Sequence, residues 1–385
     1  MSTPEASNNN EEMVVTPWEV SGKIDYDKLI KEFGTQPITP EILELIQKHA
    51  GELHPQLERR IFFSHRDLDW VLQRYGAGEK FVLYTGRGPS GPVHIGHLAP
   101  WIFTKYIQDK FDAKLYFQIT DDERFLYHDN FTFEDPQKWA YENALDVIAL
   151  GMDPKKTRII MDTKSMDTLY NLAIRIAKHV TYSTARAVFG FQDSTNIGLL
   201  FYPAVQAAPA FLESYLVGHN VPCLIPAAID QDPYWRVTRD VAPKLGYYKP
   251  AQIHCRFVPG LAGLGRGSKM SASMPETAIF TIDPPELAEK KILSAFTGGR
   301  ATVEEQKRLG ANPDICSVFA WDYFLFMNQK EIEELRYNCL AGNILCGECK
   351  RNLAGRVKKF LAEHQERRER AKDHFEEYLF NPKDY

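Results

Sequence analysis

The sequence predicts an α/β protein, a doubly wound parallel sheet followed by a helical C-terminal region. Between residues 80 and 283, short apolar segments alternate with segments of helix length near 95–110, 137–150, 166–180 and 231–244. The apolar segments run without polar alternation, as expected of parallel strands that helices cover on both faces. From residue 284 the apolar residues recur at helical spacing. The expected strands are Phe81–Thr85, Leu115–Ile119, Arg158–Met161, Cys223–Ala228 and Gln252–Val258.

Composition sets the broad class. A chain of 385 residues suggests two or three domains, and 44% hydrophobic with 25% charged residues is ordinary for a globular protein. No apolar stretch reaches membrane-spanning length, and residues 1–12 lack a signal-peptide core, so we expect a cytoplasmic protein without a membrane partner. The formal charge of −5 does not exclude nucleic acid, because binding needs only a local basic patch.

Residues 1–79 are expected to form an N-terminal extension. Its first twelve residues read as a disordered polar tail. Thr39 before Pro40 predicts a helix start, with Ile42, Leu45 and Ile46 on one face. This segment should pack on the core. We expect the remaining domains at residues 80–283 and 284–372, with a short tail at 373–385.

The chain is organised around the stretch that runs from Phe81 to His97. A strand is followed by a loop with three glycines and two prolines, then by a helix and a second strand, which is a βαβ unit. Ligands of such sheets bind at the carboxyl end of the strands, where glycines let the backbone approach phosphate. In His94-Ile-Gly-His97 both imidazoles can donate to phosphate oxygens, and Gly96 leaves room for a flat base to stack.

A second glycine-flanked loop, Gly265-Arg-Gly-Ser-Lys-Met-Ser-Ala-Ser273, follows at the distance of a domain. One lysine and three hydroxyls suit a mobile clamp on a polyphosphate. Each loop alone is weak evidence, since the first has neither the spacing of a dinucleotide fingerprint nor a P-loop lysine. The two together, in this order, are specific.

The pair resembles the signature of the class I aminoacyl-tRNA synthetases, which form aminoacyl-adenylates on a Rossmann-type domain. The first motif matches the family's HIGH, and the second departs from KMSKS at Ala272. The resemblance implies that Lys269, His94 and His97 are catalytic and that Lys269 neutralises the departing pyrophosphate. It also implies Mg²⁺ carried with ATP and no dedicated protein metal site. The ATP-binding residues would be Arg87, Gly88, His94, Gly96, His97, Lys269, Met270 and Ser271.

Three further stretches place polar groups at predicted strand ends: Gln118–Glu123, Tyr202–Pro209 and Ala228–Pro233. They resemble the eukaryotic and archaeal tryptophanyl-tRNA synthetases, and the likeness extends from about Trp18 onward. Carried over by position, Tyr84 and Gln118 would accept the indole N–H, while Glu123, Gln206 and Gln231 would bind the α-amino group. The chain would activate tryptophan and esterify tRNA(Trp).

Three alternatives remain open. A tyrosyl enzyme would want a Tyr/Asp pair on the phenol hydroxyl, and the aspartates after Gln118 keep that possibility alive. A small nucleotidylyltransferase shares HIGH-like histidines but does not need a helical domain that reaches an anticodon. A non-catalytic paralogue with a binding role is disfavoured by intact His94, His97 and Lys269.

The resemblance also implies partners. Residues Pro17, Trp18 and Val20, with Ile61–Asp67, match a flap over the nucleotide pocket. The family forms homodimers, here through Tyr182–Gly190 and Phe191–Phe201. Phe296-Thr-Gly-Gly-Arg300 matches a loop near the anticodon, so Arg300 would bind tRNA, although Ala301 stands where the family often has an acidic residue.

Six cysteines in a chain of this size do not indicate a disulfide framework. Cys346-Gly-Glu-Cys349, with Cys339 nearby, has part of the spacing of a zinc site. A fourth ligand is not evident in the sequence. We expect reduced structural thiols here and no metal.

Overall fold

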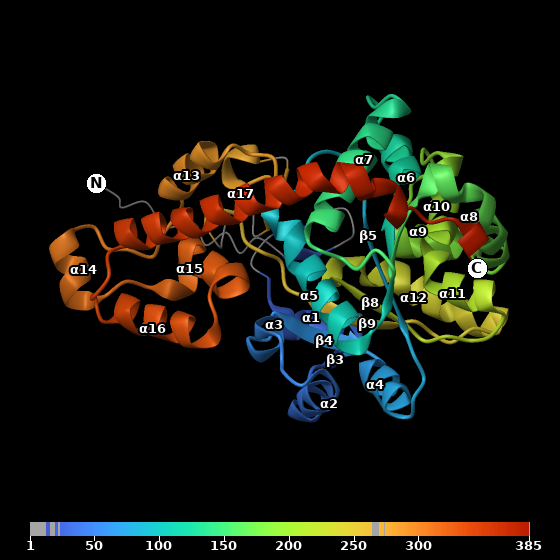
Figure 1. Cartoon of the computed structure of the whole chain (residues 1–385), viewed down its shortest axis with the longest axis horizontal. Helices are drawn as coiled ribbons and strands as arrows, with labels where there is room; N and C mark the ends of the chain where they lie inside the picture. The colour runs from blue at the N-terminus through green and yellow to red at the C-terminus, as the bar shows by residue number, and fades with distance from the viewer. Residues whose placement is uncertain (1–12, 16–19, 22–23, 264–268, 273, 385) are drawn as a thin grey trace, which may run out of the picture.

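The computed structural model describes residues 13–15, 20–21, 24–263, 269–272 and 274–384. The expected tail of residues 1–12, and Pro17 and Trp18 of the flap, lie outside the described residues. At the start of the described chain, β1 (Val14–Val15) pairs antiparallel with β2 (Val20–Ser21). A sheet of seven strands, in the order β3-β4-β9-β8-β5-β6-β7, forms the centre of the molecule (Figure 1).

The five strands of the Rossmann-like part are mutually parallel, which confirms the predicted α/β core. Their apolar residues are buried from both sides, as the unbroken hydrophobic runs predicted. The expected fifth strand is shorter than predicted, because Phe257 N–H donates to Tyr26 Oη (3.0 Å) instead of to a neighbouring strand. The strands are β5 (Val82–Arg87), β6 (Lys114–Ile119), β7 (Thr157–Met161), β8 (Cys223–Ala228) and β9 (Ala251–Cys255).

The sheet is not purely parallel, which corrects the sequence prediction. The N-terminal extension contributes β3 (Gln36–Pro37) and β4 (Phe62–Arg66), both antiparallel to their neighbours. Strand β4 was not predicted from the sequence, because several of its residues are polar. Each has a partner in the fold: the buried Ser64 Oγ hydrogen-bonds His254 Nδ1 (2.9 Å), and Nε of the half-buried Arg66 donates to Asp232 Oδ1 (2.8 Å).

Helices cover both faces of the sheet, so the doubly wound arrangement is confirmed. One core cluster joins the sheet to α2, α4, α5 and α7, and the other joins it to the helices from α8 to α12. The predicted helix after Thr39 is α2, with Ile42 and Ile46 buried. The helices up to this point are α1 (Tyr26–Phe33), α2 (Pro40–Ala50), α3 (Pro55–Glu58), α4 (Leu68–Gly76), α5 (Ile95–Phe111), α6 (Asp121–Tyr127), α7 (Glu134–Ala149), α8 (Asp162–Ala177), α9 (Tyr182–Phe189), α10 (Ile197–Ala207), α11 (Pro209–Val217) and α12 (Asp232–Val241).

The C-terminal region is helical, as predicted, and α17 ties it to the sheet domain. Figure 1 shows α17 passing from the C-terminal helices across to α7. The expected boundary at residue 372 falls inside α17, which continues to Tyr378. The Tyr378 hydroxyl donates to Met152 O (2.9 Å). Residues 373–380 are therefore packed and not a separate tail; Phe380 N–H donates to Ile159 O. The helices are α13 (Pro285–Leu293), α14 (Val303–Leu309), α15 (Ser317–Trp321), α16 (Gln329–Leu340) and α17 (Cys346–Tyr378), with a π-helical turn at Asp322–Phe326.

Candidate active site

A cavity of about 450 Å³ opens at the carboxyl ends of β5, β6 and β8. The first motif, residues 269–272 and the ends of α6 and α10 surround it. Every residue predicted to bind ATP or the amino acid lines this one cavity, although these residues come from five separate stretches of the chain. They are Tyr84, Arg87, Gly88, His94, Gly96, His97, Gln118, Glu123, Gln206, Gln231, Lys269, Met270 and Ser271.

The two histidines stand stacked at the start of α5. Their ring centroids are 3.5 Å apart, and His94 N–H donates to His97 Nδ1 (3.2 Å). Because His97 Nδ1 accepts, its ring proton is on Nε2, which is free to act as a donor. Burial, followed by the charge of Arg87, lowers the pKa of both rings well below the usual value, so both are neutral at pH 7. They can donate hydrogen bonds to phosphate without adding a charge.

Arg87 supports the loop that leads to these histidines. Its Nε donates to Asn143 Oδ1 and its guanidinium also reaches Pro92 O (3.1 Å), while Asn143 Nδ2 donates to Gly91 O (3.0 Å). Burial lowers the pKa of Arg87 to about 9, so the side chain remains charged at pH 7. At the other side of the loop, a Cβ on Gly88 would lie 2.0 Å from Arg124 Nε, so a larger residue there would displace the Arg124 side chain.

Lys269 reaches the cavity from the second motif. Its Nζ lies 3.4 Å from Asp230 Oδ2 and 5.5 Å from the centroid of the Phe257 ring. Asp230 is buried, which raises the pKa of its carboxyl, and its Oδ1 has no hydrogen-bond partner among the described residues. The ammonium is thus placed at the cavity by a single weak ion pair, and Met270 N–H anchors the segment to Val258 O (2.9 Å).

Tyr84 and Gln118 meet deep in the cavity on neighbouring strands. Tyr84 Oη donates to Gln118 Oε1 or to Gln206 O (2.6 Å). Gln118 Nε2 donates to both carboxylate oxygens of Asp162, at 2.8 and 2.9 Å. The carboxylate fixes the amide orientation, because only the NH₂ end can donate to it. Tyr84 Oη and Gln118 Oε1 therefore lie side by side, and each oxygen can accept one more hydrogen bond.

Glu123 has a buried carboxylate whose oxygens accept no hydrogen bond from the described residues. It is 2% exposed, and burial raises the pKa of its carboxyl. Arg124 Nε forms an ion pair with Oε2 (2.7 Å), and neither carboxylate oxygen accepts a hydrogen bond among the described residues. A ligand ammonium at this position would satisfy them.

Sequence reasoning missed several residues of the cavity wall and one residue that contacts the wall. Asp162 does not line the cavity but accepts from Gln118, and it gave no signal because this contact depends on the pairing of β6 with β7, which places Gln118 opposite Ile160. Asp230 belonged to a stretch that the sequence singled out, and its pairing with Lys269 appears only in the fold. The other residues that sequence analysis did not assign include Arg124, Tyr202, Tyr234, Trp235 and Phe257.

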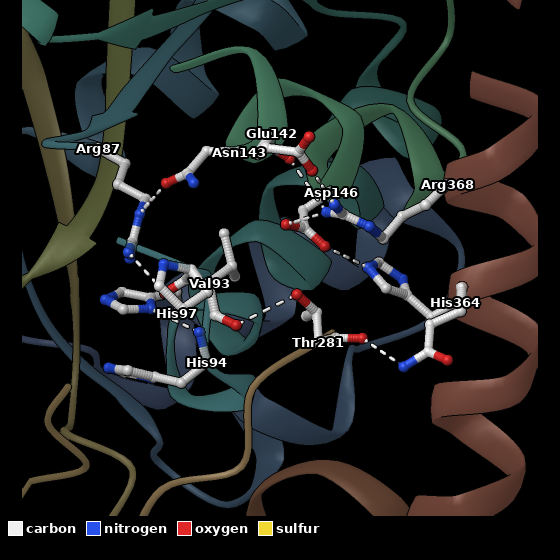
Figure 2. A network of polar contacts seen from close by, with 12 residues as sticks. Arg87, Val93, His94, His97, Glu142, Asn143, Asp146, Thr281, His364 and Arg368 are labelled. Atoms are coloured by element: carbon white, nitrogen blue, oxygen red, sulfur yellow. Dashed lines mark hydrogen bonds and ion pairs between the residues drawn. The ribbon is translucent and has the colours of Figure 1, made fainter. Parts of the chain in front are cut away.

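A buried polar network joins this site to α17 (Figure 2). Asp146, one turn beyond Asn143 on α7, pairs with Arg368 and accepts from His364 Nε2 (2.8 Å). A second connection runs through Thr281, whose Oγ1 donates to Val93 O (3.2 Å) and whose carbonyl accepts from Gln365 Nε2 (2.8 Å). The segment that precedes His94 is thereby held by groups that belong to the C-terminal helix.

Arg300 does not belong to the cavity. It lies exposed in the C-terminal region, where its Nε donates to Gly310 O (3.0 Å). Its loop is held closely, because a Cβ on Gly298 would lie 1.8 Å from Asn312 O. The structure therefore separates the predicted tRNA contact from the predicted catalytic groups.

Comparisons with known proteins agree with this geometry. Residues 77–362 match the model of the class I tRNA synthetases for W and Y. A parallel Rossmann-like sheet with HIGH-type histidines and a facing lysine at its carboxyl edge defines a class I aminoacyl-tRNA synthetase.

The individual relatives that match this chain are specific for one amino acid. The tryptophan–tRNA ligase of Pyrobaculum calidifontis is 51% identical, over 97% of this chain and 99% of its own length. That of Thermococcus sibiricus is 54% identical, over 96% and 94% respectively. The crystal structure of the Plasmodium falciparum tryptophanyl-tRNA synthetase matches with a TM-score of 0.87 and 37% identity, over 93% of this chain and 98% of that chain. The chain belongs to the tryptophan–tRNA ligase family.

Proposed function

We propose that this chain activates L-tryptophan with ATP, giving tryptophanyl-adenylate and pyrophosphate, and then transfers tryptophan to the 3′-terminal ribose of tRNA(Trp). The observation that carries the proposal is the convergence of the predicted ATP and amino-acid residues on one cavity. Its volume of about 450 Å³ falls in the range of small-molecule sites.

The reaction needs alignment and charge stabilisation, and no covalent nucleophile. A carboxylate oxygen of tryptophan attacks the α-phosphorus as the bond to the bridging oxygen of pyrophosphate breaks. Lys269 neutralises the charge that develops on pyrophosphate, and His97 Nε2–H donates to a phosphate oxygen. Mg²⁺ carried with ATP would bridge phosphate oxygens; among the described residues no group of three or more His, Cys, Asp or Glu forms a ready-made metal site.

Tryptophan fits the deep end of the cavity better than tyrosine does. Tyr84 and Gln118 offer acceptor oxygens to an indole N–H, and Glu123 offers a carboxylate to the α-ammonium, with Gln206 and Gln231 beside it. A tyrosine pocket needs an aspartate on the phenol hydroxyl. Asp162, the aspartate that contacts Gln118, does not line the cavity and accepts from the Gln118 amide with both of its oxygens.

The decisive test is amino-acid-dependent ATP–pyrophosphate exchange on the intact chain. We expect exchange with tryptophan and far less with phenylalanine, which has no donor for the buried acceptors, or with tyrosine, whose hydroxyl lies at a different position from the indole N–H. Exchange driven by tyrosine would overturn the specificity, and no exchange with any amino acid would favour a non-catalytic role.

Replacing Asp162 should loosen that specificity. In Asp162→Asn the carboxylate that fixes the Gln118 amide is lost, and the amide can turn its NH₂ group toward the indole. We expect KM for tryptophan to rise about tenfold, the value of one well-placed hydrogen bond, with a smaller change in kcat. Asp167→Asn, exposed on the same helix, is the control and should leave KM unchanged. An unchanged KM in Asp162→Asn would exclude this role.

The C-terminal helices would recognise tRNA. We propose that residues 80–283 form the catalytic domain, that residues 284–372 read the anticodon, and that Arg300 contacts it. The exposure of Arg300 on a closely held loop, away from the cavity, supports this division. Arg300→Ala should then reduce aminoacylation and spare pyrophosphate exchange.

We also propose that the chain is a synthetase of the eukaryotic type, with a cytoplasmic location and a homodimeric assembly. Large apolar side chains are exposed together near α8, α9 and α10, including Ile197 at 84%, Tyr182 at 50% and Tyr170 at 52%. In the described part of the chain, no helix is long and apolar enough to cross a membrane.

The dimer can be tested at its most exposed apolar residue. Ile197→Asp would bury a carboxylate at the contact, so we expect the variant to elute as a monomer in light-scattering chromatography while the native chain elutes as a dimer. Leu309→Asp, exposed on α14 outside the patch, should leave the mass unchanged. A native chain of monomer mass would contradict the proposal.

A further inference from the structure

Residues 278–283 lie between the first motif and the C-terminal helix α17, and we call this segment the clasp. It pairs antiparallel with the start of the first motif. Thr281 donates to Val93 O twice, through its N–H (2.8 Å) and its Oγ1 (3.2 Å). In the other direction, Ile95 N–H donates to Ile279 O (2.9 Å). Three hydrogen bonds thus join the clasp to the main chain on both sides of the first histidine.

The clasp and both motifs share one apolar cluster. Ile95 of the first motif, Met270 of the second motif and Ile279 of the clasp are buried members of this cluster. Helix α17 contributes Leu361 to the same cluster. By contrast, Leu98, one turn further along α5, belongs to the cluster of the sheet. Because closely packed interiors transmit small displacements, the first turn of α5 should follow the position of the clasp and of α17.

Gln365 of α17 holds the clasp from the side opposite the first motif. Its Nε2 donates to Thr281 O (2.8 Å) and to Asp283 O (2.9 Å). Both partners are carbonyl oxygens, which can only accept, so the NH₂ end of the Gln365 amide must face the clasp. Figure 2 shows Thr281 between Val93 and α17. Since Thr281 accepts from Gln365 and donates to Val93, two successive hydrogen bonds connect α17 to the first motif.

The shape of the clasp is maintained by contacts that do not involve Gln365. Lys291 Nζ donates to Ala278 O (2.9 Å) and forms an ion pair with Asp283 Oδ2 (2.7 Å). The same carboxylate oxygen accepts from Phe280 N–H (3.1 Å). The two ends of the clasp are thereby tied together through one lysine. Removing the Gln365 donor should therefore shift the clasp without unfolding it.

The position of the clasp is important because the neighbouring main chain places both imidazoles. His94 N–H donates to His97 Nδ1 (3.2 Å), and the two rings are stacked with their centroids 3.5 Å apart. The His94 ring also lies 6.3 Å, between centroids, from the ring of Phe280 in the clasp. A displacement of this main chain would therefore move both rings together. A misplacement of about 1 Å at a reacting centre can cost about 10²-fold in rate.

We propose that Gln365 is a positioning residue for the first motif. It acts through Thr281 and the Val93 carbonyl, and it sets where the two histidines, His94 and His97, lie at the cavity. Helix α17 therefore contributes to adenylate formation, in addition to the tRNA recognition proposed for the C-terminal helices. This role rests on the proposed function, because the histidines act on the phosphates of ATP.

The role of the donor is tested by comparing kcat and KM in tryptophan-dependent pyrophosphate exchange. Gln365→Leu keeps the approximate size of the side chain but cannot donate. We expect kcat to fall about tenfold, which is within the range for misplaced catalytic groups. KM for tryptophan should stay unchanged, because Tyr84 and Gln118 lie on β5 and β6. Gln365→Lys keeps a donor at the end of a chain of similar length and should recover most of kcat.

The matched control is Gln47→Leu, the same substitution at an exposed glutamine on α2, which should behave like the native chain. Circular dichroism checks that each variant is folded. A native kcat in Gln365→Leu, or an equal loss in Gln47→Leu, would overturn the proposal. A KM for tryptophan that rises as much as kcat falls would also overturn it, since that result would indicate a general disruption of the cavity.

A second readout does not depend on catalysis. Amide hydrogen exchange, followed by mass spectrometry, reports how well the Ile95 N–H is protected by its bond to Ile279 O. We expect this amide to exchange about tenfold faster in Gln365→Leu than in the native chain or in Gln365→Lys. Native protection in Gln365→Leu would refute the link from α17 to the first motif. Failure of pyrophosphate exchange in the intact chain, with the amide result as expected, would refute the proposed function and leave that link in place.

Discussion

Lys269→Ala is expected to lower tryptophan-dependent ATP–pyrophosphate exchange about 10²- to 10³-fold, the usual effect of removing one preorganised charge-stabilising group. The reason is geometric. Lys269 is held at the cavity by Asp230 and lines the same cavity as His94 and His97. In the variant, Asp230 also loses the cation that offsets its burial, so the local potential becomes less favourable to phosphate.

Measuring kcat and the affinity for tryptophan separately distinguishes an effect on the chemical step from an effect on substrate binding. We expect kcat to fall much more than the affinity for tryptophan, because Lys269 does not reach the Tyr84–Gln118 end of the cavity. Lys269→Arg keeps the charge on a planar head and should recover part of the rate. Lys244→Ala, at an exposed position, should behave like the native chain. A Lys269→Ala enzyme within threefold of native would remove Lys269 from the mechanism.

The parts of the fold that sequence could predict are those with a local signal. Strands β5, β6 and β8 are apolar runs between turn residues, and α5 begins at a motif that ends in Gly-His. The antiparallel strand β4 lacked such a signal, because Ser64, His65 and Arg66 are polar and gain partners only in the folded sheet. A single sequence shows which residues are apolar, but it does not show which polar residues will find hydrogen-bond partners in the folded protein.

The residues of the candidate site also divide into those with a local signal in the sequence and those without one. The residues in recognisable motifs were found, and the cavity brings them together. Asp162 was missed, since it contributes through a partner far away in sequence. It meets Gln118 through the register of two parallel strands. Contacts of this kind need the tertiary structure.

Asp146→Ala is expected to destabilise the protein by about 3–5 kcal/mol, the cost of breaking a buried ion pair by removing one partner. Asp146 is 1% exposed and Arg368 is 6% exposed. Without the carboxylate, the Arg368 guanidinium keeps Glu142, while His364 Nε2 loses its hydrogen bond. Both residues lie on the face of α17 that packs against α7 (Figure 2).

The loss should appear as a lower midpoint of urea unfolding at pH 7. Asp146→Asn retains the size and one acceptor oxygen for His364, so it should cost less than the alanine variant. Glu366→Ala removes an exposed partner of Arg370 on the same helix and should cost under about 1 kcal/mol. Equal effects of Asp146→Ala and Glu366→Ala would show that the network in Figure 2 does not hold α17 to the catalytic domain. A loss confined to Asp146 would instead mean that this one buried carboxylate fastens α17 to α7 through Arg368 and His364.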